Sequence, residues 1–144
     1  MSTIRDLLDN YVLVVSTCGW LSAQLIKTII VWITTKKFDV ERLTGAGGMP
    51  SAHSAAVTGM TIAVAKTVGV GDPLFGIAFL FASVVMYDAT GVRRAAGEHA
   101  KKINEIGKKH QLFSEMLQES LGHTPLEVLG GALLGILLAM IIPQ

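Results

Sequence analysis

Apolar residues gather in four long segments separated by polar connections. The segments are Tyr11 to Thr34, His53 to Val70, Pro73 to Ala89 and Pro125 to Pro143. A helix that crosses a membrane needs about 20 mostly apolar residues, so this pattern predicts four transmembrane helices. A break near Gly19 would divide the first segment and give five. The fourth segment contains Gly130, Gly131 and Gly135, which allow close approach of a second helix.

The longest polar stretch, Gly91 to Gly122, has a helical pattern of its own. Apolar residues recur in it at intervals of three or four, and charged residues fall between them, which predicts an amphipathic helix. Such a helix could lie on the membrane surface or cap the bundle. The apolar residues of the pattern are Val92, Ala96, Ala100, Ile103 and Ile106.

Composition agrees with a membrane protein. Hydrophobic residues make up 51% of the 144 residues and charged residues 16%, against about 25% charged in ordinary soluble domains. The length fits one domain, so we expect residues 1–144 to form a single all-α, membrane-embedded bundle. The formal net charge of +1 gives no reason to expect a nucleic-acid partner. We identify no removable signal peptide, and Cys18 lies in an apolar segment where it suits a packed core.

Basic residues concentrate in two of the three connections. The first connection carries three and the third carries six, which is nine of the chain's 12 Lys and Arg residues, and the short connection Gly69 to Pro73 carries none. The positive-inside rule therefore places both basic connections in the cytoplasm. The nine residues are Lys36, Lys37, Arg42, Arg93, Arg94, Lys101, Lys102, Lys108 and Lys109.

Three polar motifs lie where the apolar segments meet these basic connections. They are Gly47-Gly-Met-Pro-Ser-Ala-His-Ser-Ala55, Tyr87-Asp-Ala-Thr-Gly-Val-Arg-Arg94 and Gly122-His-Thr-Pro-Leu-Glu-Val-Leu-Gly-Gly131. With four helices, one topology brings all three motifs to the same membrane face. Histidines together with cationic side chains suit chemistry on phosphate esters.

The third motif predicts a helix start. Thr124 suits the N-cap, Pro125 the first helical position and Glu127 the reciprocal position of a capping box. One interpretation is that Glu127 only caps the helix and His123 is a loop residue. The other is that Glu127 accepts the imidazole N–H of His123 and leaves the second ring nitrogen free to attack phosphorus. The two interpretations are compatible.

The first motif predicts another helix start, with His53 just after Pro50 and Ser51. Backbone N–H groups at a helix start favour anions, and the preceding glycines allow the chain to approach a ligand. A simple Gly-Pro turn with an interfacial histidine explains the same residues.

Charged residues near the same membrane end complete the candidate site. Asp88, Arg93 and Arg94 end the third segment, where they could form a structural ion pair or bind phosphate through the arginine fork. Lys27 lies within an apolar segment, at a cost of about 2.5–3.5 kcal/mol on insertion scales. It could serve the site or extend its amine to the interface. No metal-ligand spacing is present, so we expect Lys and Arg to balance the phosphate charge without a metal or other cofactor.

Together the motifs resemble those of the type 2 phosphatidic acid phosphatase superfamily, which includes vanadium haloperoxidases. Pro50-Ser-Ala-His53 resembles its Pro-Ser-Gly-His motif, and His123-Thr-Pro-Leu-Glu127-Val-Leu-Gly-Gly resembles its His-x-x-x-Asp-Val-Leu-Ala-Gly motif. The full set is closer still to a divergent bacterial and plant branch. The resemblance covers the chain from Lys27 to Gly135.

The resemblance implies a role for each residue. His123 would be the nucleophile that forms a phosphohistidine, His53 would protonate the leaving oxygen, and Glu127 would orient His123 in place of the usual aspartate. The remaining candidates would bind the phosphate, with Asp88 pairing one arginine: Lys27, Arg93, Arg94 and the backbone N–H groups of Ser51 and Ala52. The superfamily's first Lys-Arg-Pro motif is absent, and Leu117 stands where an arginine usually precedes the nucleophile, so Arg93 or Arg94 would supply that charge.

The resemblance implies a metal-independent phosphatase in the cytoplasmic membrane, acting on a lipid phosphate or diphosphate from the cytoplasmic side. Two other functions fit the same pattern: a catalytically silent membrane protein that binds anionic lipid headgroups, and a small transporter or assembly subunit. Expected partners are the lipid substrate and membrane lipids. The glycine-rich fourth segment also permits a homodimer.

Overall fold

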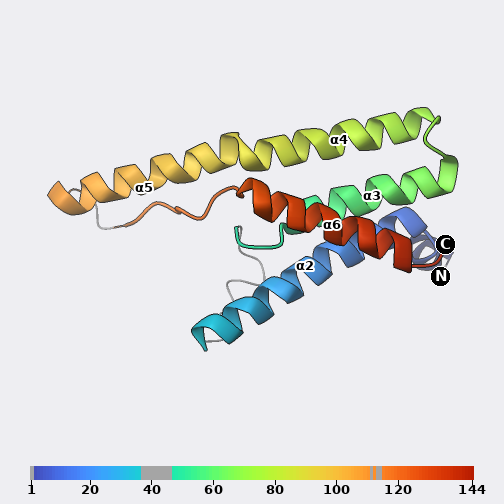
Figure 1. Ribbon diagram of the computed structural model, residues 1–144, viewed down its shortest axis with the longest axis horizontal. Coiled ribbons are helices and arrows are strands. Elements are labelled where there is room, and N and C mark those ends of the chain that lie inside the picture. The colour runs from blue at the N-terminus through green and yellow to red at the C-terminus, as the bar shows by residue number, and fades with distance from the viewer. Residues whose placement is uncertain (1, 37–46, 111, 113–114) are drawn as a thin grey trace.

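The computed structural model describes residues 2–36, 47–110, 112 and 115–144. Six helices account for most of them, and no strand occurs among the described residues (Figure 1). The helices are α1 (Ser2–Leu8), α2 (Tyr11–Thr35), α3 (Ala52–Val68), α4 (Pro73–Thr90), α5 (Val92–His110) and α6 (Pro125–Ile141). Both chain ends lie at the same end of the bundle.

The four apolar segments correspond to α2, α3, α4 and α6, within two residues at every boundary. The all-α prediction is confirmed. The alternative break near Gly19 is wrong, because α2 runs through Gly19 without interruption. Gly19 instead gives α3 room to approach, since a Cβ there would lie 2.8 Å from the carbonyl oxygen of Ala55.

Two helical stretches in the described residues are long and apolar enough to cross a membrane, Tyr11–Thr35 and Pro73–His110. Pro125–Ile141 is a shorter apolar helix. The number of crossings stays a prediction. Of the basic residues used to assign orientation, Lys37 and Arg42 lie outside the described residues.

Helix α3 lies at the centre of the bundle and packs on α2, α6 and α4. Its buried residues are small, as close helix packing requires. Hydroxyl groups join the helices as well: Ser16 of α2 donates to the carbonyl oxygen of Ala56 at 3.2 Å, and Thr61 of α3 donates to that of Ala78 in α4 at 3.2 Å. The central helix is therefore packed on three sides and joined to α2 and α4 by side-chain hydrogen bonds.

The glycines of α6 face α3 of the same chain. A Cβ on Gly131 would collide with the carbonyl oxygen of Ser51, and one on Gly135 would collide with that of Ala55. The close approach expected of the fourth segment thus occurs within the chain, and the homodimer stays a prediction.

Helices α4 and α5 run end to end, and α5 continues beyond the ends of α3 and α6 (Figure 1). The amphipathic helix is confirmed. Of its two predicted placements, capping of the bundle is wrong, because among the described helices α5 contacts α4 alone. A position on the membrane surface stays a prediction. The buried residues of this helix also differ from the expected apolar stripe. Val92, Ile103 and Ile106 are exposed, and only Ala100 of the predicted set is buried. The buried residues of α5 are Gly97, Ala100, Asn104 and Gly107.

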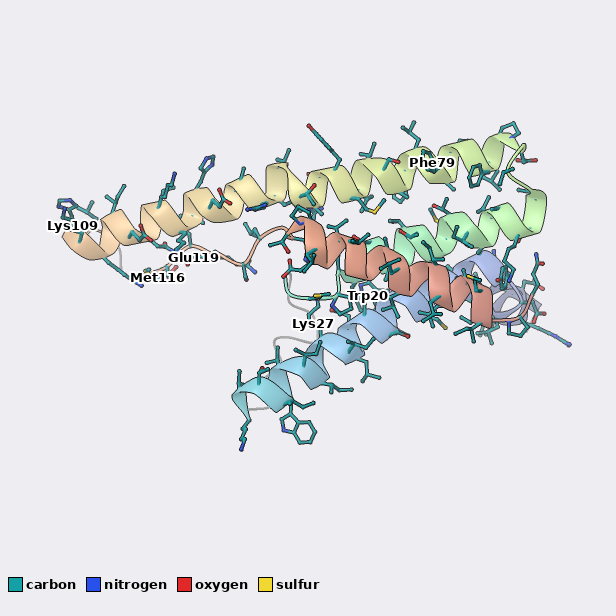
Figure 2. All side chains as sticks on the ribbon, in the orientation of Figure 1. Trp20, Lys27, Phe79, Lys109, Met116 and Glu119 are labelled. Carbon is teal, nitrogen blue, oxygen red and sulfur yellow. The ribbon has the colours of Figure 1, made fainter. Side chains whose placement is uncertain are left out.

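The segment that returns from α5 to α6 packs on this small-residue face, as Glu119 beside α5 illustrates (Figure 2). The side-chain amide of Asn104 donates to the carbonyl oxygen of Leu117 and to a carboxylate oxygen of Glu119, both at 2.8 Å. Its carbonyl oxygen accepts the backbone N–H of Leu117 at 2.9 Å. Asn104 therefore fixes the path of the chain that leads to His123.

Candidate functional site

His123 lies immediately before α6, where local hydrogen bonds determine its position. Thr124 is the N-cap, and its side chain and that of Glu127 form the predicted capping box. One carboxylate oxygen of Glu127 accepts the backbone N–H of Thr124 at 2.9 Å and lies 3.3 Å from Nδ1 of His123. Glu127 therefore both caps α6 and contacts the imidazole of His123, as the two sequence interpretations together predict. A proton on Nδ1 would leave Nε2 of His123 with a free lone pair.

The loop before His123 is fixed by backbone contacts to the junction of α4 and α5. The backbone N–H of His123 donates to the carbonyl oxygen of Ala89 at 2.9 Å. Gly122 has a φ of +76°, and a Cβ there would collide with the backbone of Arg94. Only glycine allows the chain to pass this junction, and His123 is buried, with 6% of its side chain exposed.

The start of α3 lies beside the start of α6. Ser51 is the N-cap of α3, and its hydroxyl accepts the backbone N–H of Ser54 at 3.3 Å. Its own backbone N–H donates to the carbonyl oxygen of Glu127 at 3.0 Å. This bond joins the two helix starts, so the positive ends of two helix dipoles meet here.

Two of the expected phosphate contacts, Ser51 and Ala52, are buried and line neither pocket described below. The backbone N–H of Ser51 is already used by the bond to Glu127. Ser51 and Ala52 thus form part of the packed helix start behind the pockets, and direct contact of either residue with a phosphate stays a prediction.

A pocket of about 190 Å³ contains both histidines. His53 enters it from the first turn of α3 and His123 from the loop before α6, although the two are 70 residues apart in sequence. Asp88 and Arg93 line the same pocket from the end of α4 and the start of α5. The remaining walls are apolar apart from backbone: Val84, Val85, Ala89, Leu121 and Gly122.

The two arginines of the second motif lie on different sides of His123. Nε of Arg93 lies 2.5 Å from a carboxylate oxygen of Asp88, which is the predicted acid–arginine pair. Arg94 pairs with Glu98 at 3.2 Å and lines a neighbouring pocket of about 200 Å³ with Gly48 and Glu127. Sequence spacing alone could not separate them. The structure brings Arg93, and not Arg94, into the pocket that holds both histidines.

The third predicted cation, Lys27, lies near the site but lines neither pocket. It is buried in α2, with 4% of the residue exposed, and its aliphatic stem lies beside Gly48. Figure 2 shows its position on α2, where that helix passes the turn before α3. Gly48 has a φ of +81°, which favours glycine, and the lack of a side chain there leaves room for Lys27.

The pKa of His123 is lowered from its ordinary value, mainly because burial disfavours the charged imidazolium. Hydrogen bonding to Glu127 and the charge of its carboxylate act in the opposite direction. The positive charges of Lys27 and Arg93 lower the pKa further. The net effect favours the neutral imidazole, which is the form whose nitrogen lone pair could act as a nucleophile.

Sequence reasoning missed the residues that position the loop of His123. Asn104 and Gly97 of α5 hold the returning segment, and a Cβ on Gly97 would lie 2.7 Å from the carbonyl oxygen of Glu119. The sequence pattern that could have indicated these residues is an asparagine, Asn104, at helical spacing from Gly97 and Gly107. Within the part of the chain that the structure describes, no three His, Cys, Asp or Glu side chains form a group that could hold a metal ion.

Comparison with known proteins supports the resemblance found in the motifs. Residues 8–138 match the Divergent PAP2 family, which confirms the predicted divergent branch. The chain is also 40% identical over 152 aligned positions to the uncharacterized membrane protein YuiD of Bacillus subtilis (strain 168). That alignment covers 95% of this chain and 96% of the relative. No solved structure gives a significant match.

Proposed function

The chain belongs to the Divergent PAP2 family, and on that premise we propose that it is a membrane phosphatase that forms a phosphohistidine on His123. The observation that carries the proposal is the shared pocket of His53 and His123, with Glu127 beside Nδ1 of His123. A membrane-protein relative and the apolar helices support a membrane location.

In the first step, Nε2 of neutral His123 attacks phosphorus and the bond to the leaving oxygen breaks. His53, in its protonated form, gives its proton to that oxygen, so the alcohol or phosphate leaves without a developing negative charge. Glu127 accepts the Nδ1 proton in a hydrogen bond and stabilises the positive charge that develops on the imidazole.

In the second step, His53 accepts a proton from a water molecule as the water attacks the phosphohistidine. The phosphorus–nitrogen bond breaks, inorganic phosphate forms, and His123 returns to its neutral state. Arg93 and Lys27 balance the charge on the phosphoryl oxygens in both steps. To contact the phosphoryl oxygens, Arg93 shares or leaves its ion pair with Asp88.

The substrate we propose is a lipid phosphate or diphosphate approached from the cytoplasmic side. The pocket lies where α3 and α6 begin and α4 ends, so it would lie at headgroup level in a bilayer crossed by these helices. A protein that binds anionic headgroups without turnover is the competing function, because the same cations would serve it.

The decisive experiment is a phosphate-release assay of the purified protein with a panel of lipid phosphates, beside His123→Ala and Glu127→Gln. We expect no turnover from His123→Ala. We expect Glu127→Gln to lose about 10²–10⁴-fold, the range typical of a lost acid–base contribution. His99→Ala is the matched control, because His99 is an exposed residue of α5 outside the pocket.

The assay should be run with a strong chelator, in which we expect activity to persist. Acid-labile phosphate on the protein, present in wild type and absent from His123→Ala, would identify the intermediate. Equal turnover by His123→Ala and wild type would contradict the mechanism. Activity that is lost with chelator and restored by magnesium would point to another class of enzyme, and headgroup binding without release would favour the silent protein.

A further inference from the structure

An apolar groove of about 530 Å³ lies between α2, α3 and α4, toward the end of the bundle away from the histidines. Met60 and Val64 line it from α3, and Leu74, Ile77 and Phe81 line it from α4. Its volume lies within the range of small-molecule pockets, about 300–1,000 Å³. The third wall consists of Val12, Leu13 and Ser16 of α2 and its N-cap residue Asn10.

The groove and the histidine pocket follow one another along the same faces of α3 and α4. On α3, His53 lines the pocket, and Met60 and Val64, seven and eleven residues later, line the groove. At 3.6 residues per turn these intervals return to nearly the same face. On α4, Asp88 lines the pocket and Phe81, seven residues earlier, lines the groove.

On α4, the residues that line the groove are followed within one turn by those that line the histidine pocket. Phe81 belongs to the groove, and Val84 and Val85, three and four residues later, belong to the pocket. The groove therefore follows the polar pocket directly along α4, an arrangement that suits an amphiphile with one charged end.

The pocket and the groove together extend over at least the depth of one leaflet, because the 14 residues from Leu74 to Asp88 on α4 rise about 21 Å at 1.5 Å per residue. Eleven residues from His53 to Val64 rise about 16 Å at 1.5 Å per residue. Half of a hydrocarbon core of about 30 Å is about 15 Å. At the far end the groove is bounded by Asn10, whose side chain caps α2 by accepting the backbone N–H of Leu13 at 3.1 Å.

We propose that this groove binds the hydrocarbon chain of an amphiphilic phosphate whose phosphate group occupies the histidine pocket. The inference rests on the proposed function and adds a site for the chain. The groove makes the protein selective for chain length, because each added methylene gains contact until the chain reaches the polar boundary at Asn10.

The test uses the full chain in lipid nanodiscs with butyl, octyl, dodecyl and hexadecyl phosphates as substrates. Ile77→Trp fills the groove, and Leu80→Trp is the matched control on the same helix. Ile77 and Leu80 are similarly exposed, at 67% and 64%, but only Ile77 lines the groove. The control also corrects for the tendency of long chains to enter the nanodisc.

We expect the ratio of kcat/KM for dodecyl phosphate to that for butyl phosphate to fall about tenfold or more in Ile77→Trp, in the range by which apolar pockets discriminate. The ratio should keep its wild-type value in Leu80→Trp. An unchanged ratio in Ile77→Trp, or an equal loss in Leu80→Trp, would overturn the groove while leaving the phosphatase intact.

Binding of the matching alkyl phosphonates, measured by calorimetry in the same nanodiscs, tests the groove without turnover. Affinity should rise with chain length in wild type and in Leu80→Trp and should rise less in Ile77→Trp. If no phosphate ester is hydrolysed but this binding pattern is observed, the proposed phosphatase activity is contradicted and the proposed chain-binding groove is supported. Affinity that is independent of Ile77 would overturn the groove by itself.

Discussion

The two ends of the helical bundle each contain a lysine from an apolar helix, but the two lysines have different surroundings. The histidine end contains His53, Arg93 and His123 around a pocket, and the buried Lys27 lies close enough for its charge to lower the pKa of His123. The tyrosine end contains Lys66 of α3, Tyr11 of α2 and the last carbonyl groups of α6. There Nζ of Lys66 donates to the hydroxyl of Tyr11 at 2.6 Å and to the carbonyl oxygen of Ala139 at 2.9 Å.

The difference follows from helix polarity. At the tyrosine end, Lys66 and Tyr11 donate to carbonyl groups of the last turn of α6, where positive charge is favourable. Lys66 also lies 4.9 Å from the centre of the Tyr11 ring. At the histidine end, cations gather beside two helix starts, which are themselves positive. Positive charge at the tyrosine end therefore faces the negative end of α6, whereas at the histidine end it adds to two positive helix starts, an arrangement that favours an anion.

The largest effect expected from this comparison is in membrane topology. Lys102→Cys and Gly71→Cys, each in a Cys18→Ala background, place one label on each side of the membrane. We expect an impermeant thiol reagent added to intact cells to label position 71 and not position 102, because the positive-inside rule predicts that the basic connections face the cytoplasm. Labelling of 102 but not 71 would reverse the orientation of the site.

The next effect separates the arginines of the histidine end. Arg93→Ala should reduce turnover and vanadate inhibition together by about 10²-fold, the cost of removing one transition-state donor. Arg94→Ala should cost less, because Arg94 lines the neighbouring pocket. The test is to measure the turnover rate and the vanadate inhibition constant of both variants and of wild type. A larger loss from Arg94→Ala would mean that the neighbouring pocket holds the phosphate.

A smaller effect is expected at the tyrosine end. Lys66→Met removes two hydrogen bonds and should lower the free energy of unfolding by about 1 kcal/mol, with turnover at the wild-type level. Denaturant unfolding in detergent micelles gives the first value and phosphate release the second. Lys27→Met is the matched change at the other end and should lose turnover. Equal loss of turnover in both variants would remove the distinction between the two ends.

The smallest effect is a shift in pH dependence. Turnover requires neutral His123, so it falls when the pH drops through the pKa of that imidazole. The charge of Lys27 lowers this pKa and the carboxylate of Glu127 raises it. The acid limb of kcat/KM should therefore move to higher pH in Lys27→Met and to lower pH in Glu127→Gln, as recorded in residual activity. Shifts in the same direction would show that another group controls the limb.

Local chemistry could be predicted from the sequence because its partners are close in the chain. The helix start at Thr124, Pro125 and Glu127 depends on bonds between residues three or four apart, and the structure contains those bonds. The apolar segments likewise predicted α2, α3, α4 and α6, because the length and hydropathy of a helix are properties of a single segment. The family was recognisable for the same reason, since its motifs are short.

Only the tertiary structure decided which surfaces meet. Periodicity assigned the buried face of α5 to its apolar residues, but the returning segment packs on Gly97 and Asn104, and the missing side chain of Gly97 lets its backbone approach. Contact between the two helix starts depends on Ser51 and Glu127, which are far apart in sequence. By itself the sequence determined the helices and the family. Packing between distant segments decided which cation shares the pocket with the histidines, because such contacts depend on shape rather than on local pattern.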